Sequence, residues 1–466
     1  MKDKELTLNK ETSFIRTALT LALPIAFQNL LTSCATLIDT AMVVGLGNAE
    51  TSAMGVSARF SFLLNVVCFG FASGCAALLS QYWGAKDRRN IRRSLGFVMI
   101  ISMTFAIIYT ALLAFFPSAL INIFTDDPIT IPLGASYLKI FSIAVPFIVF
   151  SQVMCIALRS VECVKIPLIS SSASVVLNTF INYCLINGHF GLPALGLRGA
   201  AIGSVAGYIL QTAIIVAAVI ICDTPFRCRL SEYTGFSRDF CRKYFKTALP
   251  VLLNETLWAV GTNIYVMVLA RQGRENHAGY TLYENIQQIF FVFFVGICGA
   301  CSVMVGMNVG SGDHGEAYKV ARRFAVLTPV LGIILGACLI LLRNPVLSLF
   351  AIETETTRAV ASSCLLFYGF WIAMRMIPYT MICGIFRAGG DTKAGCFFDL
   401  FGMYAFGIPA MLVTGLLIRP SNFVVLVAVM FIAEDTLKGI LCVRHFRSRK
   451  WIKQITSKEE ADDITI

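Results

Sequence analysis

Long apolar runs separated by short polar segments make up almost the whole chain. A helix that crosses a hydrocarbon core of about 30 Å needs about 20 mainly apolar residues, and about twelve runs reach that length. These runs lack the alternation of apolar and polar residues that marks the strands of a membrane barrel. The sequence therefore predicts an all-α polytopic membrane protein. Its expected transmembrane helices are residues 18–45, 55–82, 95–116, 131–157, 166–187, 197–222, 245–270, 280–309, 323–342, 359–384, 396–418 and 421–443.

Hydrophobic residues make up 57% and charged residues 14% of the 466 positions, whereas a soluble domain has about 25% charged residues. The formal net charge is +11, and the placement of the 38 Lys and Arg residues decides what that charge means. Most of them lie in alternate segments between the helices, above all in 86–93, 227–246 and 444–458. By the positive-inside rule, both termini are expected in the cytoplasm. We expect a multi-pass plasma-membrane protein that contacts the lipid bilayer and binds no nucleic acid.

Short motifs of the first half of the chain recur in the second half at a nearly constant offset. Ala22-Leu23-Pro24 recurs as Ala248-Leu249-Pro250, an offset of 226 (248 − 22), and Arg159 recurs as Arg387 at an offset of 228 (387 − 159). Since each half holds an even number of helices, the halves are parallel repeats, an arrangement typical of secondary transporters that place the substrate between the repeats. The predicted parts are an amino-terminal six-helix lobe, a cytoplasmic linker, a carboxy-terminal six-helix lobe and a cytoplasmic tail, at residues 1–222, 223–244, 245–445 and 446–466.

Polar residues follow one face of the first predicted helix, at Asn29, Thr32, Thr36 and Asp39. Spacings of three and four residues place them on one side of a helix. An ionised carboxylate costs several kcal/mol in a membrane unless a proton or a cation neutralises it, roughly the scale of a useful coupling energy. Asp39 is therefore predicted to couple the entry of H⁺ or Na⁺ to transport. The alternative is a structural carboxylate held by Thr36 or by a neighbouring helix.

The fifth predicted helix has a similar stripe at Ser171, Ser174, Asn178 and Asn182. Its two amides are suited to hydrogen-bond Asp39 or to complete the oxygen shell of an ion. Polar residues at this spacing also join neighbouring helices without any further role.

The carboxy-terminal lobe contains a second set of polar residues, and we expect a cavity there. Arg375 lies near the middle of the tenth predicted helix and needs a buried partner, for which Glu255 and Glu284 are the candidates. Such a pair could act as a gate, bind substrate or serve structure alone. Tyr265 and Tyr379 complete this candidate cavity.

Four other charged residues lie nearer the ends of the last two predicted helices: Asp399, Glu434, Asp435 and Lys438. The i,i+4 spacing of Glu434 and Lys438 predicts an ion pair at the surface. We expect these residues to be structural.

Ordered motifs are spread over both halves. Leu37-Ile38-Asp39-Thr40 precedes Gly45-Leu46-Gly47 in and after the first helix, and Gly84-Ala85-Lys86-Asp87 follows the second. Residues 178–203 and 386–393 (FRAGGDTK) carry two more motifs. In this order they resemble the motifs of the multidrug and toxic compound extrusion (MATE) family, and the resemblance extends from about residue 15 to residue 455.

This resemblance implies a V-shaped antiporter of twelve helices that exports organic, often cationic and amphipathic, compounds in exchange for H⁺ or Na⁺ by alternating access. Asp39 would be its amino-lobe coupling carboxylate, with Asn178 nearby. The chain departs from the family pattern at three places: Asn182 stands where some members have an acid, Glu255 lies about one turn before the usual acid, and Arg375 occupies an acidic position. These departures favour H⁺ at Asp39 over a cation site in the carboxy-terminal lobe.

Other functions fit the sequence less well. A flippase for lipid-linked saccharides can share this architecture, while an intramembrane enzyme needs a nucleophile, a base or a metal site. The four histidines lie in loops or at helix ends without metal-ligand spacing. We therefore expect no enzyme and no cofactor other than the coupling ion, and we expect a monomer. A cavity lined by Phe, Met, Tyr and Trp accepts many substrate shapes, so the sequence does not specify the organic small molecule.

Overall fold

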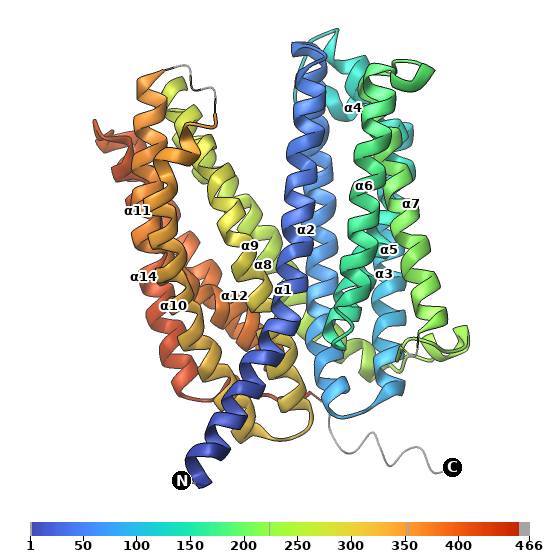
Figure 1. Cartoon of the computed structure of the whole chain (residues 1–466), viewed down its shortest axis with the longest axis vertical. Coiled ribbons are helices and arrows are strands. Elements are labelled where there is room, and N and C mark those ends of the chain that lie inside the picture. The colour runs from blue at the N-terminus through green and yellow to red at the C-terminus, as the bar shows by residue number, and fades with distance from the viewer. Residues whose placement is uncertain (1, 223, 351, 353, 456–466) are drawn as a thin grey trace. The chain divides into compact units, whose positions relative to one another are not determined.

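The computed structural model of the chain describes residues 2–222, 224–350, 352 and 354–455. The last part of the predicted cytoplasmic tail, residues 456–466, lies outside the described residues. Throughout the described part the regular elements are helices, apart from one isolated bridge between Gly390 and Ile452 (Figure 1). The predicted all-α fold class is confirmed.

Most helices are longer than the apolar runs that predicted them, because polar residues continue them at one or both ends. The α-helices are α1 (Lys2–Val44), α2 (Asn48–Gly84), α3 (Arg88–Phe115), α4 (Pro117–Asn122), α5 (Thr130–Ser160), α6 (Lys165–Asn187), α7 (Leu197–Ile221), α8 (Arg238–Ala270), α9 (Arg274–Gly310), α10 (His314–Leu347), α11 (Glu355–Tyr379), α12 (Thr392–Leu400), α13 (Ile408–Leu412) and α14 (Phe423–Arg447). Short 3₁₀ turns cover His189–Gly191 and Leu230–Tyr233.

Within the described residues, eleven helical segments are long and apolar enough to cross a membrane, and they coincide with the first eleven predicted spans. The chain is thus a multi-pass membrane protein. The twelfth predicted span is helix α14, which has 25 residues but contains Glu434, Asp435 and Lys438. Because of these three charges, α14 is not among the eleven segments that are apolar enough to cross a membrane. All three side chains are nevertheless buried within the protein.

Three π-helical segments interrupt the helices that follow α11: Thr380–Phe386, Phe401–Gly407 and Val413–Ile418. Two prolines lie beside them, Pro378 and Pro409. A proline has no N–H for the carbonyl four residues earlier, and a local change to π geometry lets membrane helices satisfy such groups. Asp399, which belongs to the site described below, lies on α12 directly before the second of these segments.

Aspartates begin equivalent helices in the two halves. Asp87 caps α3 by accepting from the N–H of Asn90 at 3.0 Å, and Asp313 caps α10 by accepting from the N–H of Glu316 at 2.8 Å. A carboxylate at this position satisfies an amide that lacks a helical partner and also interacts favourably with the helix dipole. The two caps are 226 positions apart (313 − 87), the offset of the repeat.

The described residues form two compact units. The amino-terminal unit comprises Phe27–Leu79 and Asp87–Tyr244, and the carboxy-terminal unit comprises Met1–Ala26, Ser80–Lys86 and the chain from Phe245 onward. Contacts between α6 and α7, and of α5 with α3 and α7, hold the first together, while contacts among α9, α10, α11 and α14 do so in the second. The lobe boundaries drawn from the sequence stay predictions.

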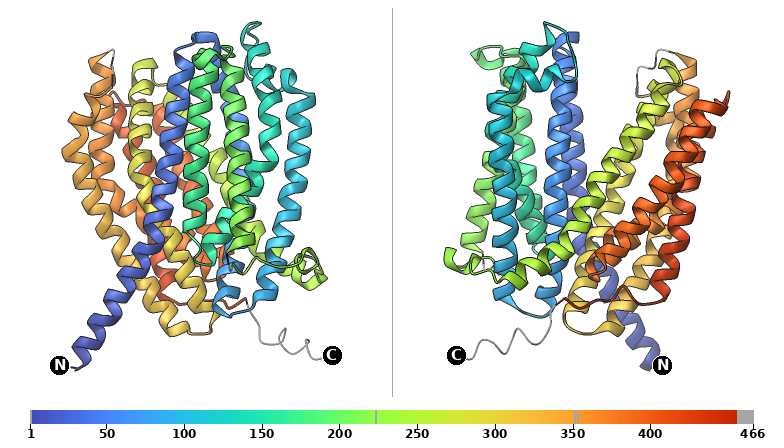
Figure 2. Two further views of the ribbon diagram at one scale, coloured as in Figure 1. Left: turned by 45° about the vertical axis from the view of Figure 1, so that its right-hand side comes forward. Right: turned by 180° about the vertical axis from the view of Figure 1, so that it is seen from behind.

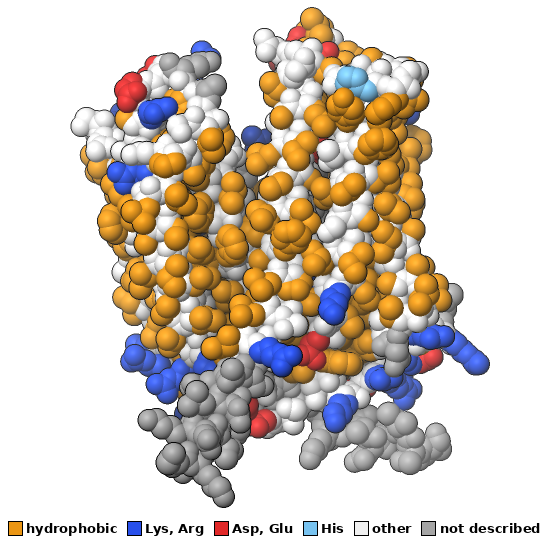
Figure 3. Space-filling model, in the orientation of Figure 1, with side chains coloured by type: hydrophobic (Ala, Val, Ile, Leu, Met, Phe, Trp, Pro, Cys, Tyr) orange, Lys and Arg blue, Asp and Glu red, His pale blue; other side chains and the backbone are white. Residues whose placement is uncertain are grey.

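Hydrophobic side chains cover the middle of the helices on the face seen in Figure 3, whereas most of the visible Lys and Arg side chains lie near the lower edge of this view. A band of exposed apolar residues is what helices in contact with lipid require. Basic residues at the ends of membrane helices are typical of the cytoplasmic side, and the orientation of the termini stays a prediction.

The last described residues pack along the loops at this basic end, within the carboxy-terminal unit. Trp451 is fully buried against Gly389, and the N–H of Lys453 donates to the carbonyl of Gly389 at 2.7 Å. Asp391 accepts hydrogen bonds from Lys453 Nζ at 2.8 Å and contacts His445 Nε2 at 3.0 Å. Burial raises the pKa of the Asp391 carboxyl, but the bonds from His445 and Lys453 outweigh it and hold the pKa below its usual 3.8.

Acid is expected to release this terminal segment. A carboxylate with a lowered folded-state pKa contributes stability that is complete above its unfolded pKa of about 3.8 and is lost as the pH falls through the folded value. Pepsin digestion at pH 3 should therefore cut residues 448–455 faster than digestion at pH 4.5, beyond the change in the protease's own rate. In the Asp391→Asn variant the segment should be cut quickly at both pH values. Equal protection of the variant and the original protein at pH 4.5 would contradict this role.

Candidate functional site

Asp39 lies half-buried on α1 and faces two amides of α6 within the amino-terminal unit. Asn182 Nδ2 donates to Asp39 Oδ1 at 2.7 Å. Asn178 lies one turn earlier, and with its amide nitrogen turned toward the carboxylate it donates to the two Asp39 oxygens at 3.1 and 3.3 Å. Tyr137 and Tyr208 also interact electrostatically with Asp39. The structure thus brings together Asp39, Asn178 and Asn182, three of the residues chosen from the sequence.

Close packing of α7 against α6 sets the position of the two amides. Gly199, Gly203 and Gly207 follow each other at intervals of four on α7, a spacing that lets two membrane helices approach closely. A Cβ atom at Gly203 would lie 2.0 Å from Asn182 Oδ1, and one at Gly207 would lie 3.1 Å from Asn178 Cβ. The glycines therefore make room for the side chains that reach Asp39.

A methyl group at position 203 is expected to displace Asn182 from Asp39. Because the new Cβ would overlap Asn182 Oδ1, the Gly203→Ala variant should lose about 1–3 kcal/mol of stability through overpacking and should also lose coupled activity. Thermal unfolding in detergent measures the first effect. Gly55 of α2 is the matched control, since a Cβ there meets nothing within 4 Å. Gly55→Ala should keep or slightly raise the stability, and equal behaviour of the two variants would show that this packing is not tight.

Thr36 does not hold Asp39. Its side chain is exposed and its hydroxyl donates to the backbone carbonyl of Thr32 at 3.1 Å, so the expected contact with the carboxylate is not formed. Ser171 also turns away from Asp39. It accepts from Gln28 Nε2 at 2.6 Å and from Gln211 Nε2 at 3.0 Å.

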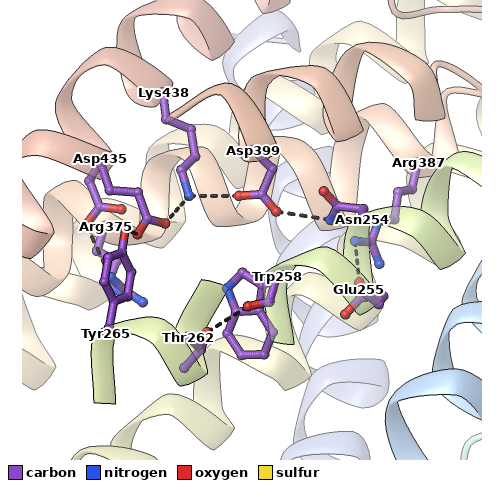
Figure 4. Close-up of polar contacts among 11 residues, drawn as sticks. Asn254, Glu255, Trp258, Thr262, Tyr265, Arg375, Arg387, Asp399, Asp435 and Lys438 are labelled. Atoms are coloured by element: carbon purple, nitrogen blue, oxygen red, sulfur yellow. Dashed lines mark hydrogen bonds and ion pairs between the residues drawn. The ribbon is translucent and has the colours of Figure 1, made fainter. Parts of the chain in front are cut away.

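The carboxy-terminal unit contains a buried network of charged side chains (Figure 4). Lys438 lies at its centre and bonds Glu434 Oε1 at 2.6 Å and Asp399 Oδ1 at 2.8 Å. Tyr265 donates its hydroxyl to Glu434 Oε2 at 2.9 Å, and Asn254 Nδ2 donates to Asp399 Oδ2 at 3.0 Å. The charged side chains of Lys438, Glu434 and Asp399 are each at least 86% buried. The prediction that Glu434 and Lys438 form a surface pair is wrong, because both residues face the interior of their unit.

Arg375 belongs to the same network. Its guanidinium lies 3.5 Å from Asp435 Oδ2 and 4.4 Å above the ring of Phe431, and Trp371 Nε1 donates to the same carboxylate oxygen at 3.1 Å. The predicted pairing of Arg375 with Glu255 or Glu284 is therefore wrong. Glu255 and Glu284 contact other residues.

Glu255 forms an ion pair with Arg387, with Oε1 and the guanidinium nitrogen 2.5 Å apart. Tyr379 interacts electrostatically with this pair and packs edge-on against Phe291. Glu284 hydrogen-bonds Tyr280 one turn earlier on its own helix. The five residues expected to line one cavity are thus divided among three places: Tyr265 and Arg375 in the charged network, Glu255 and Tyr379 beside Arg387, and Glu284 on α9.

The two units use equivalent positions for a similar set of bonds. Gln28 bonds Ser171, as Asn254 bonds Asp399, at offsets of 226 (254 − 28) and 228 (399 − 171). Arg159 NH2 donates to Gln28 Oε1 at 2.5 Å, while Arg387, at an offset of 228, donates to Glu255 beside Asn254. In the amino-terminal unit Arg159 is the one charged residue of this set, whereas in the other unit Arg387 is joined by two carboxylates, Glu255 and Asp399. The internal repeat predicted the equivalence of Arg159 and Arg387 but not that they bond Gln28 and Glu255.

No group of three or more His, Cys, Asp or Glu side chains among the described residues is placed to hold a metal ion. The family model described as MatE matches residues 24–184 and 250–413, which together are well over half of the chain. This chain belongs to the MATE family. The two matches begin 226 residues apart (250 − 24), the offset of the internal repeat. As a MATE protein, the chain is a transporter and not an enzyme.

Curated relatives of this MATE protein match over most of its length. A "Probable multidrug resistance protein NorM" of Thermotoga maritima is 24% identical over 447 residues, covering 95% of each chain. A protein of the same name from Rhodopseudomonas palustris is 27% identical and covers 85% of this chain and 84% of its own. An "Uncharacterized transporter YisQ" of Bacillus subtilis is 22% identical, with 89% and 90% covered.

Solved structures match the fold of this MATE protein. A mutant of the Vibrio cholerae MATE transporter VcmN has a TM-score of 0.83 at 15% identity, with 94% of this chain and 97% of that chain covered. A MOP superfamily transporter from Pyrococcus furiosus has a TM-score of 0.82 at 15% identity, with 93% and 94% covered. At such identities the likeness establishes the fold alone.

Proposed function

We propose that this MATE protein is a secondary antiporter that exports organic compounds in exchange for H⁺, and that Asp39 carries the proton. The observation that carries the proposal is the contact of Asp39 with the amides of Asn178 and Asn182 inside a helical unit. An ionised carboxyl within a membrane-spanning helix is costly unless a partner neutralises it. Gain and loss of a proton at this carboxyl can therefore alter the relative stability of two transporter conformations.

The amide of Asn178 can respond to that proton. With its nitrogen toward Asp39 it donates to an ionised carboxylate, and its oxygen accepts from the N–H of Ser204 at 3.0 Å. A protonated carboxyl instead donates its own proton and needs an acceptor, so gain of a proton at Asp39 changes which hydrogen bonds with Asn178 and Asn182 are favourable.

The carboxy-terminal network supports H⁺ over Na⁺ as the coupling ion. Arg375 pairs with Asp435, and Glu255 pairs with Arg387, so neither acid is open for a metal cation. With every group ionised, the four carboxylates of Asp399, Glu434, Asp435 and Glu255 outnumber the three cations of Arg375, Arg387 and Lys438, which leaves one excess negative charge (3 − 4 = −1). A buried excess charge is costly. One of these four carboxyls would then hold a proton.

The substrates proposed are organic, often cationic and amphipathic, compounds, and the support comes from relatives named as multidrug resistance proteins. The proposal includes α14 as a twelfth transmembrane helix, since its 25 residues are enough to span a bilayer and its charges are buried. It also includes a V-shaped arrangement of two six-helix lobes, cytoplasmic termini, a plasma-membrane location and a monomeric protein.

Transport in proteoliposomes tests the proposal. The purified protein is reconstituted, loaded with a fluorescent organic cation, and exposed to an imposed pH gradient or to an imposed Na⁺ gradient in separate runs. We expect efflux to follow the pH gradient and to stop when a protonophore collapses it. Efflux that follows only the Na⁺ gradient would reject H⁺ as the coupling ion. Efflux under neither gradient, with a panel of organic cations, would reject the antiport proposal.

A further inference from the structure

An apolar groove runs between α8 and the segment that begins with α12, within the carboxy-terminal unit; Figure 2 shows these elements from two sides. It has a volume of about 500 Å³. One wall is formed by Leu249, Pro250 and Leu253, and the other by residues from Lys393 to Ala405. Leu249 and Leu253 are each 47% exposed and Phe397 is 59% exposed, so the groove is open along its length.

The end of the groove at Tyr404 is lined by aromatic side chains. Tyr404 donates its hydroxyl to the backbone carbonyl of Leu257 at 2.8 Å, which joins the two walls and removes a polar group from the groove. Phe397 and Phe401 stack on each other at 5.4 Å along the second wall. In a membrane, water does not fill such a space, because its lining offers no hydrogen-bond partner. A hydrocarbon chain is the occupant that this lining fits.

The near end of the groove is basic. Lys393 lies in the groove lining and is exposed, and Lys246 is exposed one turn before Leu249 and Pro250 on the same face of α8. Both lysines belong to the end of the helices that the positive-inside rule assigns to the cytoplasm. Neither forms an ion pair with any residue in the described part of the chain. Two unpaired cations therefore lie at the mouth of a hydrocarbon-lined groove.

We propose that this groove binds one anionic phospholipid, with an acyl chain along Leu249, Leu253 and Phe397 and the phosphate headgroup between Lys246 and Lys393. Because lipid tails are as apolar as the groove, the tail does not distinguish one phospholipid from another. The charge of the headgroup determines which phospholipid is preferred. Each lysine near an anionic headgroup contributes about a fivefold preference, or about 25-fold for the pair. This site does not depend on the transport activity proposed above.

Lipid binding to the delipidated protein tests the headgroup contact. The protein in detergent is titrated with phosphatidylglycerol or phosphatidylcholine, and the first bound lipid is counted by native mass spectrometry. We expect the original protein to prefer phosphatidylglycerol, and Lys246→Gln/Lys393→Gln to reduce that preference by about 25-fold. The matched control is Lys319→Gln/Lys450→Gln, which removes two exposed lysines elsewhere in the same unit. Equal preference in the two double variants would overturn the headgroup site.

A second variant tests the groove itself without changing charge. Leu253→Trp fills the groove and should weaken binding of both lipids, whereas Leu341→Trp places the same side chain on an exposed part of α10, where Leu341 is 77% exposed. Both changes lie on exposed positions and should leave the fold intact, which gel filtration checks. Equal lipid retention by these two variants would show that no acyl chain occupies the groove. Binding of phosphatidylcholine as tight as that of phosphatidylglycerol to the original protein would likewise overturn the proposal.

Discussion

Asp39→Asn is expected to abolish gradient-driven export while the protein stays folded. Asparagine has nearly the same shape as aspartic acid and keeps hydrogen bonding to Asn178 and Asn182, but it cannot exchange a proton. The variant therefore resembles a protein held in its protonated state. Efflux of a fluorescent organic cation from proteoliposomes under a pH gradient should fall to the level of protein-free vesicles. Substrate binding in detergent should persist, since the substitution changes no large apolar surface.

Two measurements make this result specific. Asp127 is an exposed loop carboxylate that bonds Thr130, and Asp127→Asn should leave export unchanged, so any general effect of losing an acid is controlled. Gel filtration and thermal unfolding of Asp39→Asn should match the original protein. Normal coupled export by Asp39→Asn would remove Asp39 from the mechanism, whatever the family's other members do.

Lys438→Met should be the most destabilising single change in the carboxy-terminal unit. Lys438 bonds both Glu434 and Asp399, and its side chain is only 8% exposed. Removing it leaves two buried carboxylates without their cation, and breaking a buried pair in this way costs about 3–5 kcal/mol. Equilibrium unfolding in mixed micelles measures the loss. Retention of the original stability would mean that these carboxylates are neutral in the folded protein.

A charge-balanced variant separates electrostatics from packing. In Lys438→Met/Asp399→Asn the network has the same net charge as the original, so the double variant should be more stable than Lys438→Met alone. The surface pair of Lys319 and Glu316, 3.3 Å apart with Lys319 68% exposed, is the control for losing an ordinary ion pair. Lys319→Met should cost less than about 1 kcal/mol. A double variant no better than the single would mean that lost packing, not charge, destabilises the unit.

The membrane architecture was predictable because a run of about 20 apolar residues has few alternatives to a transmembrane helix. The ends of the helices were not, since polar residues such as those of 238–244 continue α8 outside the expected apolar run. The π-helical segments after Pro378 were also missed. Proline signals a disturbed helix, but the sequence does not say whether a kink or a wider turn resolves it.

In the site, the contact of Asp39 with Asn178 and Asn182 was predictable because residues four apart on one helix share a face. The network around Lys438 was misjudged, since Glu434 and Lys438 show the i,i+4 spacing of a common surface pair. Spacing cannot tell which way a helix turns such a pair. A signal was nevertheless present: three charges interrupt an apolar run long enough to cross a membrane, and such charges almost always face the protein interior.

The bond sets at equivalent positions differ in charge, and this difference has a consequence for how the two halves can diverge. Replacing Ser171 removes hydrogen bonds from Gln28 and Gln211 but strands no ion, so this position can change by itself. Around Asp399 and Lys438 a single substitution strands an ion, and a neutral intermediate exists only if two partners change together. The duplicated scaffold thus has one half in which neutral residues can be substituted singly and another in which charged residues have to be substituted together.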